Sequence, residues 1–123
     1  MSKMVKLCTL EDLPERGARG FDPEQWGHDT VFVVRRGRFV YAYRDLCPHY
    51  GNTALPWRKD AYLDTKGEAI VCAAHGARFE IATGLCTSGP CLGKSLVQIP
   101  LRVSNGGDVL ATLDTNNNGA ESP

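Results

Sequence analysis

The sequence contains two short segments in which a cysteine is followed closely by a histidine. The first is Cys47-Pro48-His49 and the second is Cys72-Ala73-Ala74-His75. Each segment supplies one thiolate and one imidazole, which are side chains that proteins commonly use to bind transition metals. Together the two segments predict a metal site with two sulfur and two nitrogen ligands.

Such a ligand set is compatible with two kinds of metal centre. Two thiolates can hold one iron of a two-iron, two-sulfide cluster while two imidazoles hold the other iron. Zinc also accepts two cysteines and two histidines, but paired ligands of structural zinc sites usually have two to four residues between them. Only Pro48 separates Cys47 from His49. We therefore favour the iron–sulfur cluster over zinc.

The neighbours of both segments favour loops. Pro48 has a fixed φ and no backbone donor, and Gly51 and Gly76 permit positive φ values. If the two loops face each other, one cysteine and one histidine from each loop can reach the same cluster.

The sequence from about Val31 to Val103 resembles the Rieske-type [2Fe-2S] ferredoxin family. The resemblance is carried by Cys47-Pro48-His49-Tyr50-Gly51, Cys72-Ala73-Ala74-His75-Gly76, Phe79, Ala82-Thr83-Gly84 and Ser88-Gly89-Pro90. It implies that a [2Fe-2S] cluster is the cofactor and that its metal ligands are Cys47, His49, Cys72 and His75. In that family the cysteines bind the buried iron and the histidines bind the exposed iron. The resemblance also implies that Ser88-Gly89-Pro90 lies in a third loop that covers the cluster.

The sequence departs from its relatives at a few informative places. The segment between the ligand loops is longer than is common in the family, and we expect the excess in Leu55 to Lys66. High-potential Rieske proteins of respiratory complexes have a serine and a tyrosine hydroxyl after the second histidine, where this chain has Ala77 and Phe79. They also join the ligand loops by a disulfide. At the corresponding places this chain has Asn52 or its neighbours and Ala74, none of which is a cysteine. We therefore expect a reduction potential in the lower part of the Rieske range of about −150 to +300 mV.

The hydrophobic pattern predicts an all-β fold. Apolar and β-branched runs typical of strands occur at residues 31–35, 38–43, 69–72, 78–81, 96–103 and 108–113. Arg36-Gly37 and Asn105-Gly106-Gly107 are typical of hairpin turns, and residues 9–14 favour a short helical turn.

From these runs we expect a Rieske-type antiparallel sandwich with an inserted cluster-binding subdomain. A single domain should cover residues 1–115, with the base sheet at about 1–46 and 95–115 and the cluster-binding subdomain at about 47–94. The polar residues 116–123 have little to bury and should form a disordered tail.

Composition and the histidine count limit the possible functions. The 14 basic and 14 acidic side chains cancel, so no long-range field should recruit nucleic acid or an anionic membrane. No run resembles a signal peptide or a transmembrane span, so we expect a cytoplasmic protein. Of the three histidines only His28 would remain beside a cluster, which is too few for the mononuclear iron of an oxygenase. We expect a carrier of electrons rather than an enzyme.

The resemblance implies the partners of such a carrier. It would take one electron from a flavin-type ferredoxin reductase and pass it to a terminal oxygenase, such as a ring-hydroxylating oxygenase, or to another oxidoreductase. The alternative is a redox-sensing or regulatory iron–sulfur module in which Cys86 and Cys91 form a thiol switch. A reducing cytoplasm favours the dithiol form of that pair, and Cys8 should pack as a small apolar residue.

Overall fold

The computed structural model describes residues 2–48, 54–56, 58–74 and 76–114. In this part of the chain the regular structure is almost entirely β. The elements, in chain order, are β1 (Ser2–Thr9), the 3-10 helix η1 (Leu10–Asp12), β2 (Ala18–Phe21), β3 (Val31–Arg36), β4 (Phe39–Arg44), β5 (Ile70–Val71), β6 (Arg78–Phe79), β7 (Cys86–Ser88), β8 (Gln98–Ile99), β9 (Leu101–Val103) and β10 (Asp108–Asp114).

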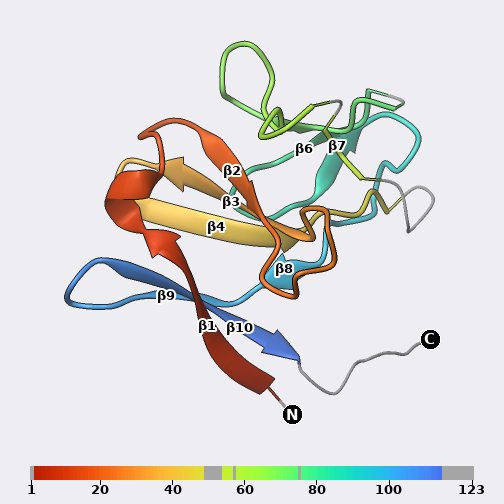
Figure 1. The fold of residues 1–123 in the computed structure, drawn as a ribbon. Helices are drawn as coiled ribbons and strands as arrows, with labels where there is room; N and C mark the ends of the chain where they lie inside the picture. Colours follow the sequence, from red (N-terminus) through yellow and green to blue (C-terminus); the bar gives the residue numbers. More distant parts are fainter. Residues whose placement is uncertain (1, 49–53, 57, 75, 115–123) are drawn as a thin grey trace.

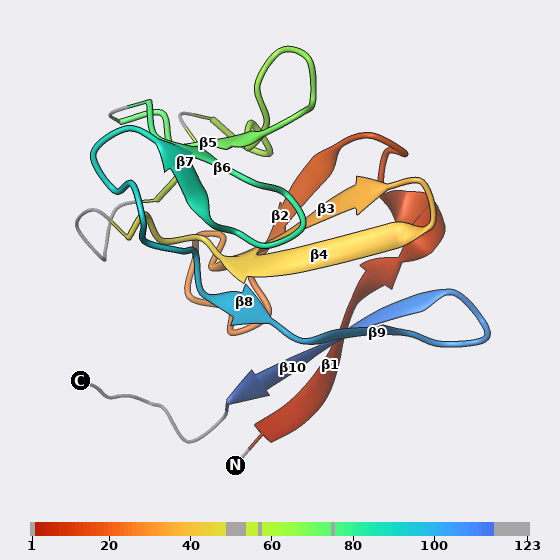
Figure 2. The ribbon, with the colours of Figure 1, turned by 180° about the vertical axis from the view of Figure 1, so that it is seen from behind.

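The strands form three antiparallel sheets. Their strand orders are β1-β10-β9, β2-β3-β4-β8 and β5-β6-β7. The four-stranded sheet lies in the middle, with the first sheet on one side of it and the small third sheet on the other (Figures 1 and 2). The predicted all-β antiparallel fold class is confirmed.

Strand β3 connects the two hydrophobic cores of the molecule. Because successive side chains of a strand point to opposite faces, Val31 and Val33 pack into the core beside the first sheet. Phe32 and Val34 pack into the core beside the third sheet. The continuous apolar run of β3 is therefore explained by burial on both faces.

The predicted strand at residues 96–103 is interrupted. Strand β8 pairs with β4 of the middle sheet, whereas β9 pairs with β10 of the first sheet. Pro100 lies between the two strands and has no N–H for a sheet hydrogen bond. The chain therefore changes sheets at this proline. Strands β1, β2 and β7 have no counterpart among the runs expected from the sequence.

The expected turns are present where the structure describes them. Gly37 and Gly107 have φ values of 65° and 90° at the two predicted hairpin turns. The helical turn near Thr9 is also confirmed, as η1, and the Thr9 amide donates a 2.9 Å hydrogen bond to the Asp12 carboxylate. Cys8 is buried, as expected of a small apolar residue. The predicted disordered tail, residues 116–123, lies outside the described residues.

Candidate metal centre

The two predicted cysteine ligands are both buried in the core beside the third sheet. Cys47 follows β4 and is 1% exposed, and Cys72 follows β5 and is 0% exposed. Both belong to the cluster of buried residues that also contains Phe79. The two predicted histidine ligands, His49 and His75, lie outside the described residues.

The second ligand loop is closed by backbone hydrogen bonds. The Gly76 amide donates to the Cys72 carbonyl at 2.8 Å, and the Cys72 amide donates to the Ala77 carbonyl at 2.9 Å. Gly76 has a φ of 72°, a conformation that favours glycine. The tight turn predicted around this glycine is therefore present.

The two ligand loops are joined through Leu55. Its carbonyl accepts a 2.8 Å hydrogen bond from the amide of Ala73, which lies in the second loop. Its amide donates a 2.8 Å hydrogen bond to the carboxylate of Asp45, which precedes the first loop. Leu55 thus connects the base of the first loop with the second loop.

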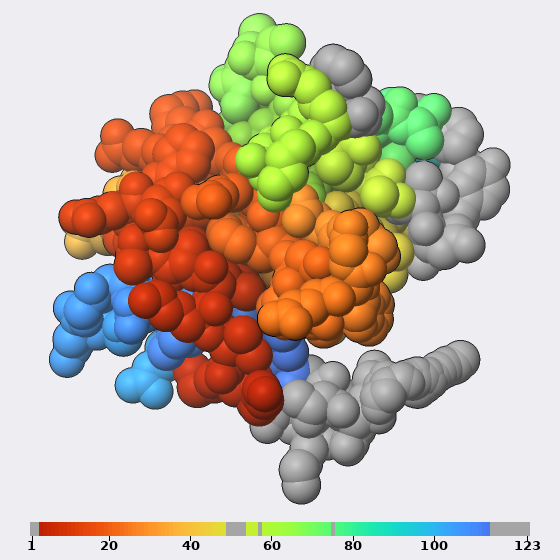
Figure 3. Space-filling view, viewed as in Figure 1, coloured from red at the N-terminus to blue at the C-terminus, as the bar shows by residue number. Residues whose placement is uncertain are grey.

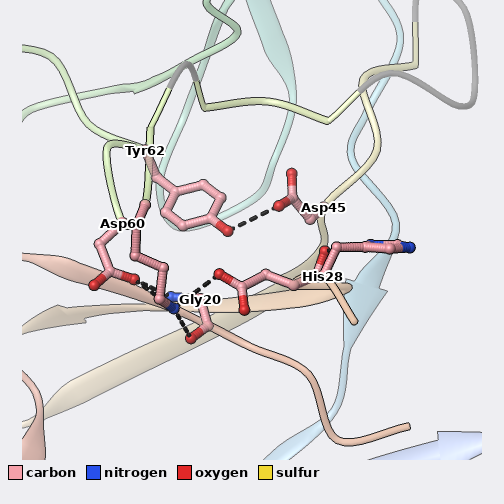
Figure 4. A network of polar contacts seen from close by, with 7 residues as sticks. Gly20, His28, Asp45, Asp60 and Tyr62 are labelled. Carbon is pink, nitrogen blue, oxygen red and sulfur yellow. Dashed lines mark hydrogen bonds and ion pairs between the residues drawn. The ribbon is translucent and has the colours of Figure 1, made fainter. Parts of the chain in front are cut away.

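Asp45 is a buried carboxylate with two hydrogen-bond donors. In addition to the Leu55 amide, it accepts a 2.8 Å hydrogen bond from the Tyr62 hydroxyl, which points toward it (Figure 4). Burial raises the pKa of Asp45, and these two hydrogen bonds oppose that rise. Burial also raises the pKa of Tyr62, and the nearby Asp45 adds to the effect. The Tyr62 hydroxyl therefore remains protonated and can donate its hydrogen bond to Asp45.

The segment after Leu55, where extra length is expected, is anchored on the middle sheet. The Tyr62 ring stacks on Phe32 with centroids 4.2 Å apart and an interplanar angle of 9°. The Lys59 ammonium lies 2.8 Å from the Asp29 carboxylate, and the Gly20 amide donates a 2.7 Å hydrogen bond to Asp60 (Figure 4). In the space-filling view this yellow-green segment lies against the orange residues of β2 and the loop after it (Figure 3).

The third loop packs against the second ligand loop. Gly89 has a φ of 102°, and a Cβ atom added there would lie 2.8 Å from the Cα atom of Ala77. Cys91, two residues later, is buried in the same core as Cys47 and Cys72. The third loop therefore contributes to the core in which the two proposed ligands are buried.

Three cysteine sulfurs meet beneath this third loop. The Cys91 thiol donates to Cys86 with 3.2 Å between the sulfurs, and the Cys86 thiol donates to the Ser88 carbonyl at 3.2 Å. Burial, together with the neighbouring Cys86 and Cys47 sulfurs, raises the pKa of Cys91. All five cysteines of the chain are described, and none of them forms a disulfide.

The remaining candidate residues are placed as follows. His28 is exposed in the loop before β3, as expected for an imidazole without a ligand role. Ala77 and Phe79, which replace the two hydroxyl donors of high-potential relatives, are both 0% exposed.

Sequence reasoning did not identify several residues that hold the site together. Asp45 and Tyr62 are separated by 17 positions in the sequence and have no local pattern that marks them as partners. The Cys86–Cys91 pair is visible in the sequence, but the 3.2 Å approach of the two sulfurs depends on the folding of the third loop. These contacts are tertiary and have no sequence signature.

Comparison with known families identifies the class of protein. The family model of the Rieske [2Fe-2S] domain matches residues 3–112. The chain therefore belongs to the Rieske [2Fe-2S] domain family, as its two ligand segments and its antiparallel sheets indicated.

Individual relatives within that family are ferredoxins. The chain is 32% identical over 87 residues to ferredoxin CarAc of Metapseudomonas resinovorans. The matched region covers 71% of this chain and 74% of the relative. It is similar to the ferredoxin of carbazole 1,9a-dioxygenase from Nocardioides aromaticivorans IC177, with 30% identity, a TM-score of 0.68 and coverage of 89% and 96% of the two chains. It is also similar to a ferredoxin of Sphingomonas yanoikuyae B1, with 26% identity, a TM-score of 0.69 and coverage of 91% and 100%.

The described residues fit the cofactor of this family. Cys47 and Cys72 supply two buried sulfur donors within one core, and buried thiols suit the iron that is shielded from solvent in a Rieske centre. Burial of these two sulfurs also affects the reduction potential. In the described part of the chain, no helix is long and apolar enough to cross a membrane.

Proposed function

We propose that this Rieske-family protein is a cytoplasmic electron carrier. It accepts one electron from a flavin-type ferredoxin reductase and passes it to a terminal oxidoreductase such as a ring-hydroxylating oxygenase. Support comes from a solved complex of reduced oxygenase and oxidized ferredoxin in carbazole 1,9a-dioxygenase. The match to that structure has 30% identity, a TM-score of 0.68 and coverage of 88% of this chain and 91% of that chain.

The proposed ligands are Cys47 and Cys72 on one iron and His49 and His75 on the other. When bound, the [2Fe-2S] cluster supplies one-electron chemistry. The protein holds the two thiolates in a dry core, and the backbone hydrogen bond between Ala73 and Leu55 fixes one ligand loop against the other. Because His49 and His75 lie outside the described residues, their role as the exposed ligands is part of the proposal.

A catalytic role of its own is not proposed for the chain. If two of its three histidines bind the cluster, only the exposed His28 remains. A mononuclear iron site of the facial-triad type needs two histidines and a carboxylate. The observation that carries the proposal is therefore the pair of buried thiols in a Rieske fold that spans nearly the whole chain.

The first experiment tests the cofactor and its sulfur ligands. Protein purified under iron-replete conditions should contain two iron and two sulfide per chain and should show the electron-resonance signal of a mixed-ligand cluster when reduced. Cys47→Ser should lose that signal, whereas Cys8→Ser, a buried cysteine in the other core, should keep it. Stoichiometric zinc without sulfide would disprove the assignment.

The second experiment tests electron transfer. A flavin-dependent ferredoxin reductase with NADH should reduce the wild-type protein in a stopped-flow spectrometer, and a ring-hydroxylating oxygenase should reoxidise it. If the loaded protein is reduced but no oxygenase reoxidises it, the cofactor assignment stands and the proposed acceptor is wrong.

A further inference from the structure

Cys86 and Cys91 form a pair of thiols on the third loop that the proposed electron transfer does not use. Their sulfurs lie 3.2 Å apart, and the Cys91 thiol donates a hydrogen bond to Cys86. Both side chains are buried, with 2% and 1% of their surfaces exposed. The sulfurs of a disulfide are about 2.0 Å apart, so these two need to approach each other by only about 1.2 Å to form one.

The backbone of the third loop holds the two cysteines close together. The Cys86 amide donates a 2.8 Å hydrogen bond to the Lys94 carbonyl, and the Lys94 amide donates a 2.8 Å hydrogen bond to the Cys91 carbonyl. Gly89 lies between the cysteines with a φ of 102°, a conformation that favours glycine. The fold of this loop therefore brings the two thiols together before any disulfide forms.

The loop itself lies at the surface, although its two sulfurs are buried. The four residues between the cysteines are all exposed: Thr87, Ser88, Gly89 and Pro90. A local opening of such a surface loop gives a small reagent in water access to both thiols. Disulfides of proteins in a reducing compartment are usually transient and serve catalysis or redox sensing. The pair therefore suits reversible oxidation rather than a permanent crosslink.

We propose that a low-molecular-weight disulfide reversibly oxidises Cys86 and Cys91 to an intramolecular disulfide, and that this bond restrains the third loop beside the metal centre. The inference goes beyond the proposed electron transfer, which needs neither thiol. Only the effect on the metal centre rests on the proposed function.

Two thiol–disulfide exchanges carry the oxidation, here written for glutathione disulfide. One cysteine loses its proton and attacks the reagent, which forms a mixed disulfide and releases one glutathione thiolate. The other cysteine loses its proton, attacks the protein sulfur of the mixed disulfide and releases the second glutathione thiolate. The two protein thiols lose two electrons, and the reagent is reduced to two glutathione molecules that take up the two protons.

The disulfide acts on the metal centre through the packing of the third loop. A Cβ atom added at Gly89 would lie 2.8 Å from the Cα atom of Ala77, which follows the second ligand loop. Cys86 and Cys91 also belong to the buried core that contains the two proposed cysteine ligands. A bond between the two cysteines limits the local opening of this loop. The oxidised protein should therefore hold a bound cluster longer than the reduced protein.

The first test maps the disulfide in cluster-loaded wild-type protein. Burial and the neighbouring Cys86 sulfur raise the pKa of the Cys91 thiol to about 12, so exchange is slow and glutathione disulfide is applied for hours at mildly alkaline pH. After alkylation of the remaining thiols, peptide mapping by mass spectrometry should find the Cys86–Cys91 disulfide, and reduced glutathione should remove it. Cys8→Ser, which alters a buried cysteine of the other core, should form the same disulfide.

The second test measures how fast an iron chelator removes the cluster. Loss of visible absorbance should become several-fold slower once the wild type is oxidised, and reduced glutathione should restore the initial rate. Cys91→Ser cannot form the disulfide and should show the same rate before and after treatment with glutathione disulfide. Iron and sulfide are measured on every sample. A wild type without a cluster counts against the proposed function, whereas the disulfide is mapped independently of that result.

Three outcomes would overturn the inference. One is the absence of a Cys86–Cys91 disulfide in the treated wild type. Another is a disulfide that joins either cysteine to a different partner. The third is an unchanged rate of cluster loss in wild type whose Cys86–Cys91 disulfide has formed completely, because the bond would then have no effect on the metal centre.

Discussion

The amide of Ala73, in the second ligand loop, donates a 2.8 Å hydrogen bond to the carbonyl of Leu55, which follows the first ligand loop. The Leu55 amide is held in turn by the carboxylate of Asp45. High-potential members of the wider family resemble this chain but join the corresponding loops by a disulfide. Here one backbone hydrogen bond, from Ala73 to Leu55, and one hydrogen bond from the Leu55 amide to a carboxylate take the place of that covalent connection.

We expect Asp45→Ala to weaken the hold of the protein on its cluster. The substitution leaves the Leu55 amide and the Tyr62 hydroxyl without their acceptor in a buried site, at a cost of about 1 to 3 kcal/mol for each. Loss of visible absorbance in the presence of an iron chelator should become several-fold faster. Asp45→Asn, which keeps one acceptor oxygen, should have an intermediate rate.

Asp22→Ala is the matched control for this experiment. Asp22 also accepts two hydrogen bonds, from the Trp26 and Gly27 amides at 2.8 Å each, but both donors belong to its own loop. Equal rates of cluster loss in Asp45→Ala and Asp22→Ala would show that Asp45 has no particular role in holding the loops.

We expect Gly20→Ala to destabilise the protein, because Gly20 lies where the segment after Leu55 is anchored on the middle sheet. An added Cβ atom would lie 2.4 Å from the Asp29 carboxylate and 2.5 Å from the Tyr62 hydroxyl. Overpacking of this kind typically costs about 1 to 3 kcal/mol, and the midpoint of thermal unfolding should fall. Gly106→Ala, which would meet nothing within 4 Å, should change the midpoint little, and an equal fall in both variants would contradict the packing argument.

The sequence predicted the parts of this structure that depend on local patterns. The runs that form β3 and β4 have the composition of strands. Cys47 and Cys72 are close in sequence to turn-forming residues, and this proximity does not depend on the rest of the fold. It could not predict that the run around Pro100 divides between two sheets, because that depends on which neighbours the two halves find. The contacts of Asp45 with Leu55 and Tyr62 likewise join residues from separate segments.

We expect Tyr43→Phe to change the stability of the protein in a pH-dependent way. The buried Tyr43 hydroxyl donates a 2.6 Å hydrogen bond to the Ile81 carbonyl, and burial raises the pKa of Tyr43 from 10.0 to about 12. Because the pKa is higher in the folded protein, the stabilisation is fully present below about pH 10. It is lost as the pH rises from about 10 to about 12.

Thermal unfolding measured at pH 8, 10 and 11 tests this expectation. At pH 8, Tyr43→Phe should lose about 1 to 2 kcal/mol, because the buried Ile81 carbonyl loses its donor. Between pH 10 and 11 the wild type should lose stability more steeply than the variant. Tyr41→Phe, a half-buried tyrosine on the same strand, controls for removal of a hydroxyl. Parallel alkaline slopes in wild type and Tyr43→Phe would refute the assignment.

The reduction potential should lie in the lower part of the Rieske range, near or below about −100 mV. Ala77 and Phe79 are fully buried in the core that holds the proposed thiolate ligands, and neither side chain has a proton to donate. Such a potential suits reduction by a flavin-type reductase.

Substitutions that restore the missing hydroxyls test this argument. Ala77→Ser and Phe79→Tyr should each raise the midpoint potential, because a hydroxyl that reaches a cluster or ligand sulfur stabilises the reduced form. Phe79→Leu alters the packing without adding a donor and should not raise the potential. The measurement is a spectroelectrochemical titration at neutral pH on samples with equal iron content. A wild-type midpoint above about +150 mV would refute the argument, because burial and backbone amides would then outweigh the absent hydroxyls.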